Sequence, residues 1–216
     1  WRKDFDPLDT HGQGFIEGNA WNYGLYVPQN VDKMIAMMGG KDEFSQHLDK
    51  IFTTPIEDKF IEKNEDITRD GIIGNYVHGN EPGHHIPYLY NWTNDAWKTQ
   101  QRVRMILDEM YTNDVDGLCG NDDAGQMSAW YVFSSLGFYP VLPGSPIYAL
   151  GSPLVNSAKI ELENGRQIEI LCHQQSETHV FVKKVVWNGE EISNYSLNHL
   201  DLVKGGKLEF FMSKKH

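Results

Sequence analysis

The sequence has 216 residues, 40% of them hydrophobic and 23% charged, so the chain is long and apolar enough to fold around a sizeable core. Its formal net charge of −11 makes nucleic acid and anionic membrane surfaces poor partners, and no apolar run is long enough to span a bilayer. The two cysteines, Cys119 and Cys172, give neither a disulfide framework nor a metal-binding spacing. A neutral ligand such as a sugar suits this chain better.

Two helices are predicted in the first quarter of the chain. Hydrophobic residues recur every three or four positions from 31 to 38, with Asn30 before them as an N-cap and a pair of glycines after them. The same spacing recurs from 44 to 52, with Asp42 as a candidate cap. We expect the two helices to form an antiparallel hairpin.

Two more helices are predicted in the middle of the chain. One runs from about residue 95 to residue 110, with Thr93 or Asn94 as its N-cap. The other, at about 125–136, has almost no polar face, which is typical of a helix buried on all sides. Gly137 supplies its C-terminal stop.

The last third of the chain has the pattern of strands and turns. Apolar residues alternate with polar ones at 158–162 and again at 168–172, and Asn164-Gly165 between them predicts a hairpin with a two-residue turn. Asn188-Gly189 and Gly205-Gly206 mark two further turns.

The expected fold class is mainly α with a β-rich tail. The composition changes near residues 140 to 150. We expect residues 1–143 to form an array of helical hairpins and residues 144–216 to form a small antiparallel β-domain.

Polar residues gather in three segments that each precede or open a helix. Free backbone N–H groups and short side chains at such places suit ligand binding, although the same residue types are also ordinary helix caps. We name the segments the first motif (residues 17–21, Glu-Gly-Asn-Ala-Trp), the second motif (78–85, His-Gly-Asn-Glu-Pro-Gly-His-His) and the third motif (120–126, Gly-Asn-Asp-Asp-Ala-Gly-Gln).

Carboxylates in these motifs favour hydrolysis of a glycosidic bond. Two carboxylates on opposite sides of a cleft can act as proton donor and as base or nucleophile. Glu17 and Asp123 are the candidate pair. Trp21 could support a sugar face or raise the pKa of the Glu17 carboxyl by excluding water, and packing beneath a helix is its alternative role.

The second motif is also a candidate metal site. His84 and His85 are adjacent, so they diverge by about 100° on a helix, and neither a zinc-ligand spacing nor a cysteine partner is present. Oxygen atoms of Asn80 and Glu81, with the Asp122-Asp123 loop, suit calcium, which takes roughly six to eight oxygen ligands. Because no EF-hand spacing exists, a calcium site would be assembled from separate segments.

At the three motifs the sequence resembles glycoside hydrolase family 92, the calcium-dependent α-mannosidases. The likeness continues through Met-Ser-Ala-Trp-Tyr at 127–131 and Ser-Ser-Leu-Gly-Phe-Tyr-Pro at 134–140, and it covers most of residues 9–154. The resemblance implies an N-terminal β-sandwich domain followed by an (α/α)6 barrel. This chain would then hold the C-terminal part of that barrel and the β-rich tail.

The resemblance also implies roles for individual residues. The family reaction inverts configuration, with Glu17 at the position of the general acid and Asp123 at that of the general base. Asn121 stands where some relatives have a second aspartate, and it would orient water. The residues assigned to substrate binding are Trp21, His78, Glu81 and Asn121, and those assigned to Ca²⁺ are Asn80 and Glu81.

The sequence therefore predicts an exo-acting α-mannosidase that releases terminal α-linked mannose, with α-1,2 as the expected linkage, from N-glycans or mannan. The resemblance implies a bacterial enzyme that is extracellular, periplasmic or at the cell surface. Because the chain begins at Trp1 without an initiator Met, we expect it to start inside a longer polypeptide and to be inactive without the missing N-terminal part. The alternatives are another (α/α)-barrel carbohydrate enzyme, such as a lyase or an α-glucosidase, and a non-catalytic glycan-binding module.

Overall fold

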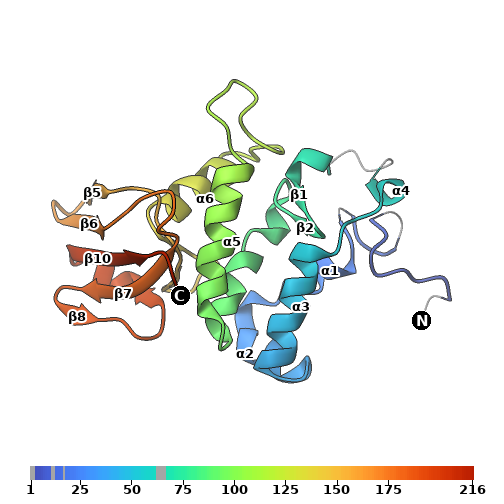
Figure 1. Ribbon diagram of the computed structural model, residues 1–216, viewed down its shortest axis with the longest axis horizontal. Helices are drawn as coiled ribbons and strands as arrows, with labels where there is room; N and C mark the ends of the chain where they lie inside the picture. Colours follow the sequence, from blue (N-terminus) through green and yellow to red (C-terminus); the bar gives the residue numbers. More distant parts are fainter. Residues whose placement is uncertain (1–2, 11–12, 17, 62–66) are drawn as a thin grey trace. The chain divides into compact units, whose positions relative to one another are not determined.

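The computed structural model describes residues 3–10, 13–16, 18–61 and 67–216, and these divide into two compact units (Figure 1). Unit 1 comprises Trp1–Ile86 and Asp108–Ala129, and unit 2 comprises Pro87–Leu107 and Trp130–His216. Helical residues before position 143 thus pack with the strands that follow it. The boundary at residue 143, as a statement about the domains of the whole protein, stays a prediction.

Helices occupy most of the ordered structure of unit 1 and also contribute to unit 2. The α-helices are α1 (Ala20–Tyr23), α2 (Val31–Met37), α3 (Lys41–Thr53), α4 (Asp58–Ile61), α5 (Ala96–Glu109), α6 (Gln126–Ser135) and α7 (His199–Leu202). The 3₁₀ helices are η1 (Pro28–Asn30), η2 (Arg69–Gly71), η3 (Glu81–Gly83) and η4 (Ile86–Trp92).

Among the described residues, the strands form three sheets. The first two elements, β1 (Ile72–Ile73) and β2 (Tyr76–Val77), pair in unit 1. The others, all in unit 2, are β3 (Phe138–Tyr139), β4 (Ile147–Leu150), β5 (Ser157–Glu161), β6 (Gln167–His173), β7 (Phe181–Trp187), β8 (Glu190–Glu191), β9 (Ser196–Asn198) and β10 (Gly206–Ser213).

The predicted helices α2 and α3 are confirmed in unit 1. The Asn30 side-chain oxygen accepts a hydrogen bond of 3.0 Å from the backbone N–H of Lys33 and so caps α2. The two glycines after α2 both have positive φ, which ends the helix as expected. One cap was wrong: α3 begins directly after Gly40, so Asp42 lies in its first turn, where its charge favours the helix dipole instead.

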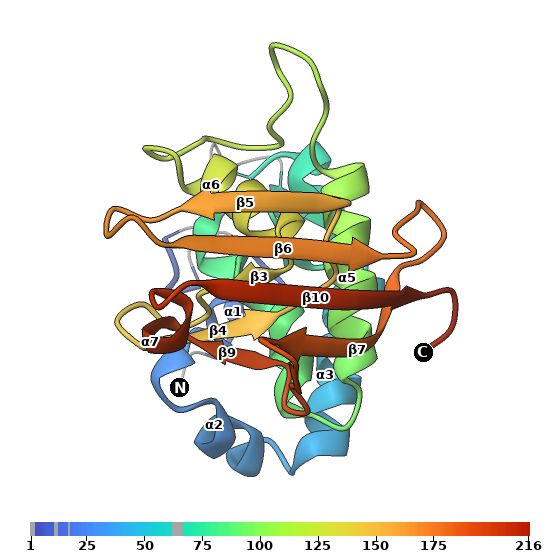
Figure 2. The same ribbon diagram turned by 90° about the vertical axis from the view of Figure 1, so that its left-hand side faces the viewer.

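Unit 2 is built on a five-stranded sheet in the order β5-β6-β10-β7-β8, whose face is seen in Figure 2. The expected antiparallel pairing is confirmed for every pair in this sheet but one, because β6 and β10 are parallel. Parallel neighbours need a long connection, and here β7, β8, β9 and α7 intervene between the two strands. The alternating apolar residues of this sheet are buried, including Ile170, Leu208 and Phe210 at 0% exposure.

The hairpin predicted at Asn164-Gly165 and the turn predicted at Asn188-Gly189 both exist, but the hairpin loop is one residue longer than expected. The first joins β5 to β6 with Ala158 opposite Ile170, and its loop has three residues, because the N–H of Leu162 still pairs with the carbonyl of Arg166 at 2.8 Å. Gly165, at φ 76°, fits the positive-φ position that such a loop requires. The second turn has the two residues Asn188-Gly189, both with positive φ, as a type I′ turn requires.

Helices α5 and α6 begin close to their expected positions. The Thr93 hydroxyl accepts a hydrogen bond from the N–H of Asp95 at 3.0 Å, ahead of α5. Trp130 in α6 is fully buried, but Tyr131 and Val132 keep 37% and 55% of their surface exposed. The expectation that α6 is buried on all sides was therefore wrong for this chain, because the outward side of its middle turn is left uncovered.

The sequence predicted both a mixture of helices and strands and a part of an (α/α)6 barrel. The chain combines helices with small sheets, as expected, while the (α/α)6 barrel stays a prediction for the longer protein. Among the residues with described positions, no helix is both long enough and apolar enough to cross a membrane.

Candidate active site

The first motif folds as a capped turn that opens α1. Glu17, its candidate acid, lies outside the described residues, so its distance from Asp123 is not given by the structure. Asn19 is fully buried, and its side-chain oxygen accepts hydrogen bonds from the N–H groups of Trp21 and Asn22 at 3.0 and 3.1 Å. The Asn22 side chain accepts in turn from the N–H of Asn19. This reciprocal capping fixes the backbone at the start of α1.

Asn75 joins the first motif to the strand that leads into the second. It lies between β1 and β2 with 0% exposure. Its side-chain oxygen accepts from Asn19 Nδ2 at 3.1 Å, and its backbone carbonyl accepts from Asn22 Nδ2 at 2.5 Å. Its own amide donates to the carbonyl of Thr54 at 2.6 Å. Asn75 was not among the residues that the sequence predicted for the site.

His78 opens the second motif from a fully buried position. Its Nδ1 lies 2.7 Å from the Tyr76 hydroxyl and its Nε2 lies 2.7 Å from the Tyr111 hydroxyl. Burial lowers the pKa of His78 well below its usual value, and the neighbouring His84 lowers it further. Since both ring nitrogens contact tyrosine hydroxyls, the ring contributes to the site through the backbone that it holds.

The two histidines at the end of the second motif are also buried. His84 Nε2 donates to the carbonyl of His78 at 3.0 Å, and burial lowers its pKa to about 4. His85 Nε2 donates to the carbonyl of Leu25 at 2.9 Å, and burial lowers its pKa too. These bonds tie the motif to itself and to the chain after α1.

A small hollow lies where the first and second motifs meet. Its lining residues include Asn80, and it has no room for a water molecule. It therefore encloses no ligand by itself, and would be only one wall of a sugar site. Glu81 follows at the start of η3 and is half-buried. The other lining residues are Gly18, Asn22, Tyr23, Val77, Pro82 and Gly83.

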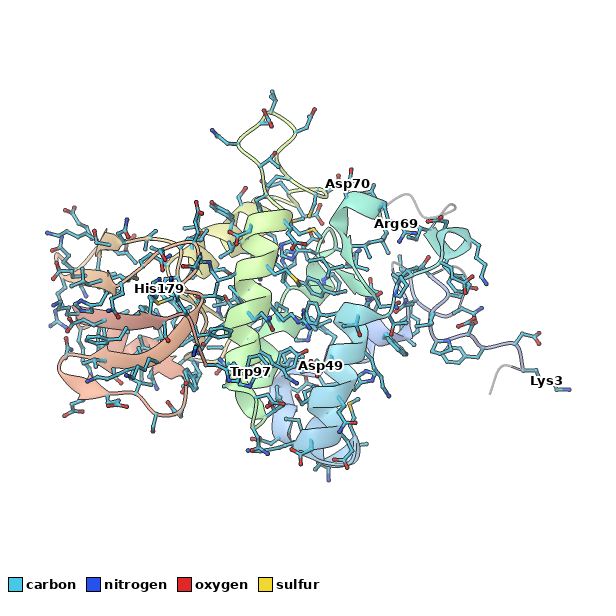
Figure 3. All side chains as sticks on the ribbon, in the orientation of Figure 1. Lys3, Asp49, Arg69, Asp70, Trp97 and His179 are labelled. Atoms are coloured by element: carbon cyan, nitrogen blue, oxygen red, sulfur yellow. The ribbon has the colours of Figure 1, made fainter. Side chains whose placement is uncertain are left out.

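Three glycines let the backbone of the third motif approach that of the second. A Cβ on Gly79 would lie 2.6 Å from the carbonyl oxygen of Cys119, and one on Gly120 would lie 2.4 Å from the carbonyl of Gly79. A Cβ on Gly71 would also meet the Cys119 carbonyl, at 2.7 Å. Gly71 ends the turn whose side chains Arg69 and Asp70 are labelled in Figure 3. No side chain other than hydrogen fits at this crossing.

The third motif makes a strained turn before α6. Asp123, Ala124 and Gly125 have φ values of 45°, 58° and 98°, a left-handed run that is costly for the two residues that carry a Cβ. Asp122 holds the helix start, because its Oδ1 accepts from the N–H and the hydroxyl of Ser128 at 3.0 and 2.9 Å. The Asp123 carboxylate is exposed, as is Asn121. The turn therefore presents Asp123 rather than Asp122 at the surface.

The side chains that bind the second motif to the third are Tyr111 and Gln126. The Tyr111 hydroxyl donates to the carbonyl of Met127 at 3.0 Å, and Gln126 Nε2 lies 3.2 Å from His84 Nδ1. Tyr111 was missed because it stands outside all three motifs. Gln126 lies in the third motif but has no charge to mark it as a site residue.

The remaining predicted site residue, Trp21, lies beside α3. Its half-buried ring meets His47 edge to face, with 5.4 Å between the ring centroids. For the metal, no group of three or more His, Cys, Asp or Glu side chains that could hold an ion occurs among the described residues. The second and third motifs are thus joined directly. Asn75, three residues before the second motif, bonds to Asn19 of the first, and Leu25, four residues after the first motif, bonds to His85 of the second.

The family model for the glycosyl hydrolase family 92 catalytic domain matches residues 1–214. The chain belongs to glycosyl hydrolase family 92. This confirms the resemblance drawn from the three motifs. A curated fungal relative, an uncharacterized secreted glycosidase of Arthroderma benhamiae, is 23% identical over 98% of this family 92 chain.

Solved structures of family 92 enzymes have the same fold. The α-mannosidase BT3965 of Bacteroides thetaiotaomicron is 42% identical over the whole chain with a TM-score of 0.91, and it has also been solved with mannoimidazole. The inverting mannosidase BT2199 of the same species is 33% identical, with a TM-score of 0.84. The chain spans 28% and 30% of those two proteins and 25% of the fungal relative.

Proposed function

We propose that this chain is part of an exo-acting α-mannosidase that releases terminal α-linked mannose with inversion of configuration. The observation that carries the proposal is the joining of the second and third motifs through the Gln126–His84 contact and the close approach of Gly79 and Gly120, with the Asp123 carboxylate exposed on a strained turn of the third motif. Membership of family 92 and the likeness to two bacterial α-mannosidases support it.

In the proposed reaction Glu17 is the general acid and Asp123 the general base. Asp123 takes a proton from the attacking water, while Glu17 gives a proton to the departing oxygen of the glycosidic bond. An inverting pair needs roughly 6.5–9.5 Å between its carboxyl groups, which leaves room for the water. Asn121, exposed two residues before Asp123, would help to orient that water. The likeness to BT2199, an inverting mannosidase, supports this stereochemistry.

Calcium is proposed to bind at the second motif. The carboxylate of Glu81 and the amide oxygen of Asn80 are hard oxygen donors in consecutive positions, which fits this ion. Two donors fall well short of roughly six to eight, so water, the sugar and the rest of the polypeptide would supply the others. When bound, the ion would hold two sugar hydroxyls and favour a flattened ring. Asn80, which lines the hollow, and Glu81, which follows it, would supply the protein's own donors to the ion.

The other proposed substrate contacts differ in how directly they act. Glu81 would touch the sugar as well as the ion, while His78 would act by fixing the backbone of Gly79 and Asn80. Trp21 would support one face of the sugar. We further propose an α-1,2 preference, mannose-rich N-glycans or mannan as substrates, and a place outside the cytoplasm, which the likeness to a secreted fungal glycosidase supports.

Replacement of the two neighbouring aspartates tests the proposed base. In the full-length enzyme, Asp123→Asn should lower kcat on α-1,2-mannobiose about 10²–10⁴-fold. Asp122→Asn is the matched control: its amide oxygen still accepts from Ser128, so kcat should fall less than tenfold. Equal losses in the two variants, or a tenth of normal activity in Asp123→Asn, would contradict the assignment. Glu17→Gln tests the acid in the same way.

Product analysis separates the alternative functions. A lyase would leave an unsaturated sugar that absorbs in the ultraviolet, and an α-glucosidase would release glucose. Calorimetric binding of mannose without any turnover by the full-length protein would favour a glycan-binding module.

Removal of metal tests the calcium proposal. Chelation should abolish mannose release and added Ca²⁺ should restore it; unchanged turnover after thorough chelation would contradict the metal proposal. The chain alone should be inactive.

A further inference from the structure

A chain of three hydrogen bonds, one buried and two part-buried, links β2 to the first turn of α6 within unit 1. It runs from the Tyr76 hydroxyl to His78 Nδ1, from His78 Nε2 to the Tyr111 hydroxyl, and from that hydroxyl to the carbonyl of Met127. The three distances are 2.7, 2.7 and 3.0 Å. Tyr76, His78 and the Met127 side chain are 0% exposed.

The chemistry of these groups fixes the direction of every bond. A carbonyl oxygen only accepts, so the Tyr111 hydrogen points at Met127. The Tyr111 oxygen must then accept from His78, which places the hydrogen of the neutral ring on Nε2. The bare Nδ1 can only accept, so the Tyr76 hydroxyl donates to it. The bonds thus form one directed chain in which removal of one hydroxyl disturbs its neighbours.

The two ends of this chain hold the two parts of the site that the proposed function uses. His78 directly precedes Gly79, Asn80 and Glu81. At the other end, the N–H of Met127 bonds to the carbonyl of Asp122 at 3.2 Å, which closes the turn around Asp123. Movement of Met127 would therefore move the exposed carboxylate.

Tyr111 is itself fixed from the side away from His78. It pairs with Leu118 in an isolated β-bridge, and the N–H of Thr112 bonds to the carbonyl of Gly117 at 3.0 Å. This closes the loop that projects beyond the end of α5 in Figures 1 and 2. A tyrosine held at the base of a closed loop can resist displacement of its hydroxyl.

We propose that Tyr111 is a positioning residue, which through His78 and Met127 holds the Asp123 turn in register with the loop of Asn80 and Glu81. The inference rests on the proposed function, since it names what keeps the base in place. The left-handed turn at Asp123 and Ala124 is costly, so it persists only when contacts with the surrounding structure hold it in place. An error of about 1 Å in a reacting group can cost roughly 10²-fold in rate.

The test is Tyr111→Phe in the full-length enzyme, with Tyr88→Phe as the matched control. Tyr88 is fully buried, whereas Tyr111 is half-buried, and the Tyr88 hydroxyl donates one bond of 2.9 Å, to Ser134 Oγ in unit 2. Both variants should lower the melting temperature, because each loses one hydrogen bond. Only Tyr111→Phe should lower kcat, about 10–100-fold, with KM changed less than about threefold.

A second variant tests the directed chain. Tyr76→Phe deletes the donor at the opposite end and should also lower kcat. The Tyr76→Phe/Tyr111→Phe enzyme should be little slower than Tyr111→Phe alone, because one chain is broken in each case. If the fold-loss of kcat in the double variant equals the product of the losses in the two single variants, the two hydroxyls act separately and the proposal is overturned.

Hydrogen exchange gives a readout that needs no turnover. The amide hydrogens of residues 125–128 should exchange at least about tenfold faster in Tyr111→Phe, and at the normal rate in Tyr88→Phe. Equal exchange and equal kcat in these two variants would reduce Tyr111 to a stabilising residue. Release of mannose by the wild-type enzyme tests the proposed function. The change in amide exchange rate at residues 125–128 tests the positioning role of Tyr111, whichever sugar the enzyme releases.

Discussion

Gln126 Nε2 lies 3.2 Å from His84 Nδ1, and this contact ties the first residue of α6 to the end of the second motif. Because His84 Nε2 donates to the carbonyl of His78, its Nδ1 must accept, and Gln126 is the donor. The neutral Gln126 amide thus links the second motif, which holds the proposed calcium residues, to the third motif, which holds the proposed base Asp123.

Loss of the Gln126 amide should therefore impair activity more than stability. Gln126→Leu in the full-length enzyme leaves His84 Nδ1 without this donor and should lower kcat/KM about tenfold. Gln175→Leu is the matched control, since the Gln175 amide donates to two backbone carbonyls in unit 2, those of Pro153 and Leu154. Steady-state kinetics should show almost no change in the control. Similar activity in both variants would contradict a role for Gln126.

Glycine at position 124 should stabilise the protein. Ala124 has φ 58°, a conformation that strains an L-residue with a Cβ, so Ala124→Gly should raise the free energy of unfolding by about 0.5–1 kcal/mol. Ala129→Gly, in the interior of α6, should lower it by about 0.5–1 kcal/mol. Urea denaturation of the two variants measures both effects. Destabilisation by Ala124→Gly would show that the turn is unstrained.

Acid should destabilise the protein below about pH 6.5, partly through His84. Its pKa is about 4 in the folded chain and near 6.5 when exposed, so the unfolded chain binds more protons between these values. Stability therefore rises with pH across this window and is lost as pH falls. Between pH 7.5 and pH 5 the loss from His84 should be about 2 kcal/mol.

Urea denaturation at several pH values checks this effect. His84→Gln should flatten the pH dependence, although His78 and His85, whose pKa values are also lowered, would still contribute. Identical curves for His84→Gln and wild type would refute the linkage.

A methyl group at Gly79 should disrupt the crossing of the second and third motifs. The new Cβ would lie 2.6 Å from the carbonyl oxygen of Cys119, so Gly79→Ala should lower the free energy of unfolding by about 1–3 kcal/mol and reduce activity. Gly144→Ala meets no atom within 4 Å but has φ 83°, so it should cost only about 1 kcal/mol and leave kcat intact. If both variants keep full activity, the close approach does not shape the site.

Local sequence patterns predicted those parts of the fold that neighbours along the chain decide. Asn30 and the glycines after α2 set the limits of that helix, and Asn188-Gly189 set a two-residue turn, because caps and turns depend on a few consecutive residues. The α3 cap and the length of the turn at Gly165 were missed by one or two residues. Alternative caps and loops of this kind differ little in free energy.

By itself the sequence also determined the family and the candidate residues, since the three motifs carry their chemistry in consecutive positions. Tertiary structure alone decided the parallel pairing of β6 with β10, the crossing at Gly79, and the contacts of Asn75, Tyr111 and Gln126. These depend on groups that lie up to 56 residues apart in the chain. Such contacts leave no periodic pattern, because folding rather than sequence spacing brings their partners together.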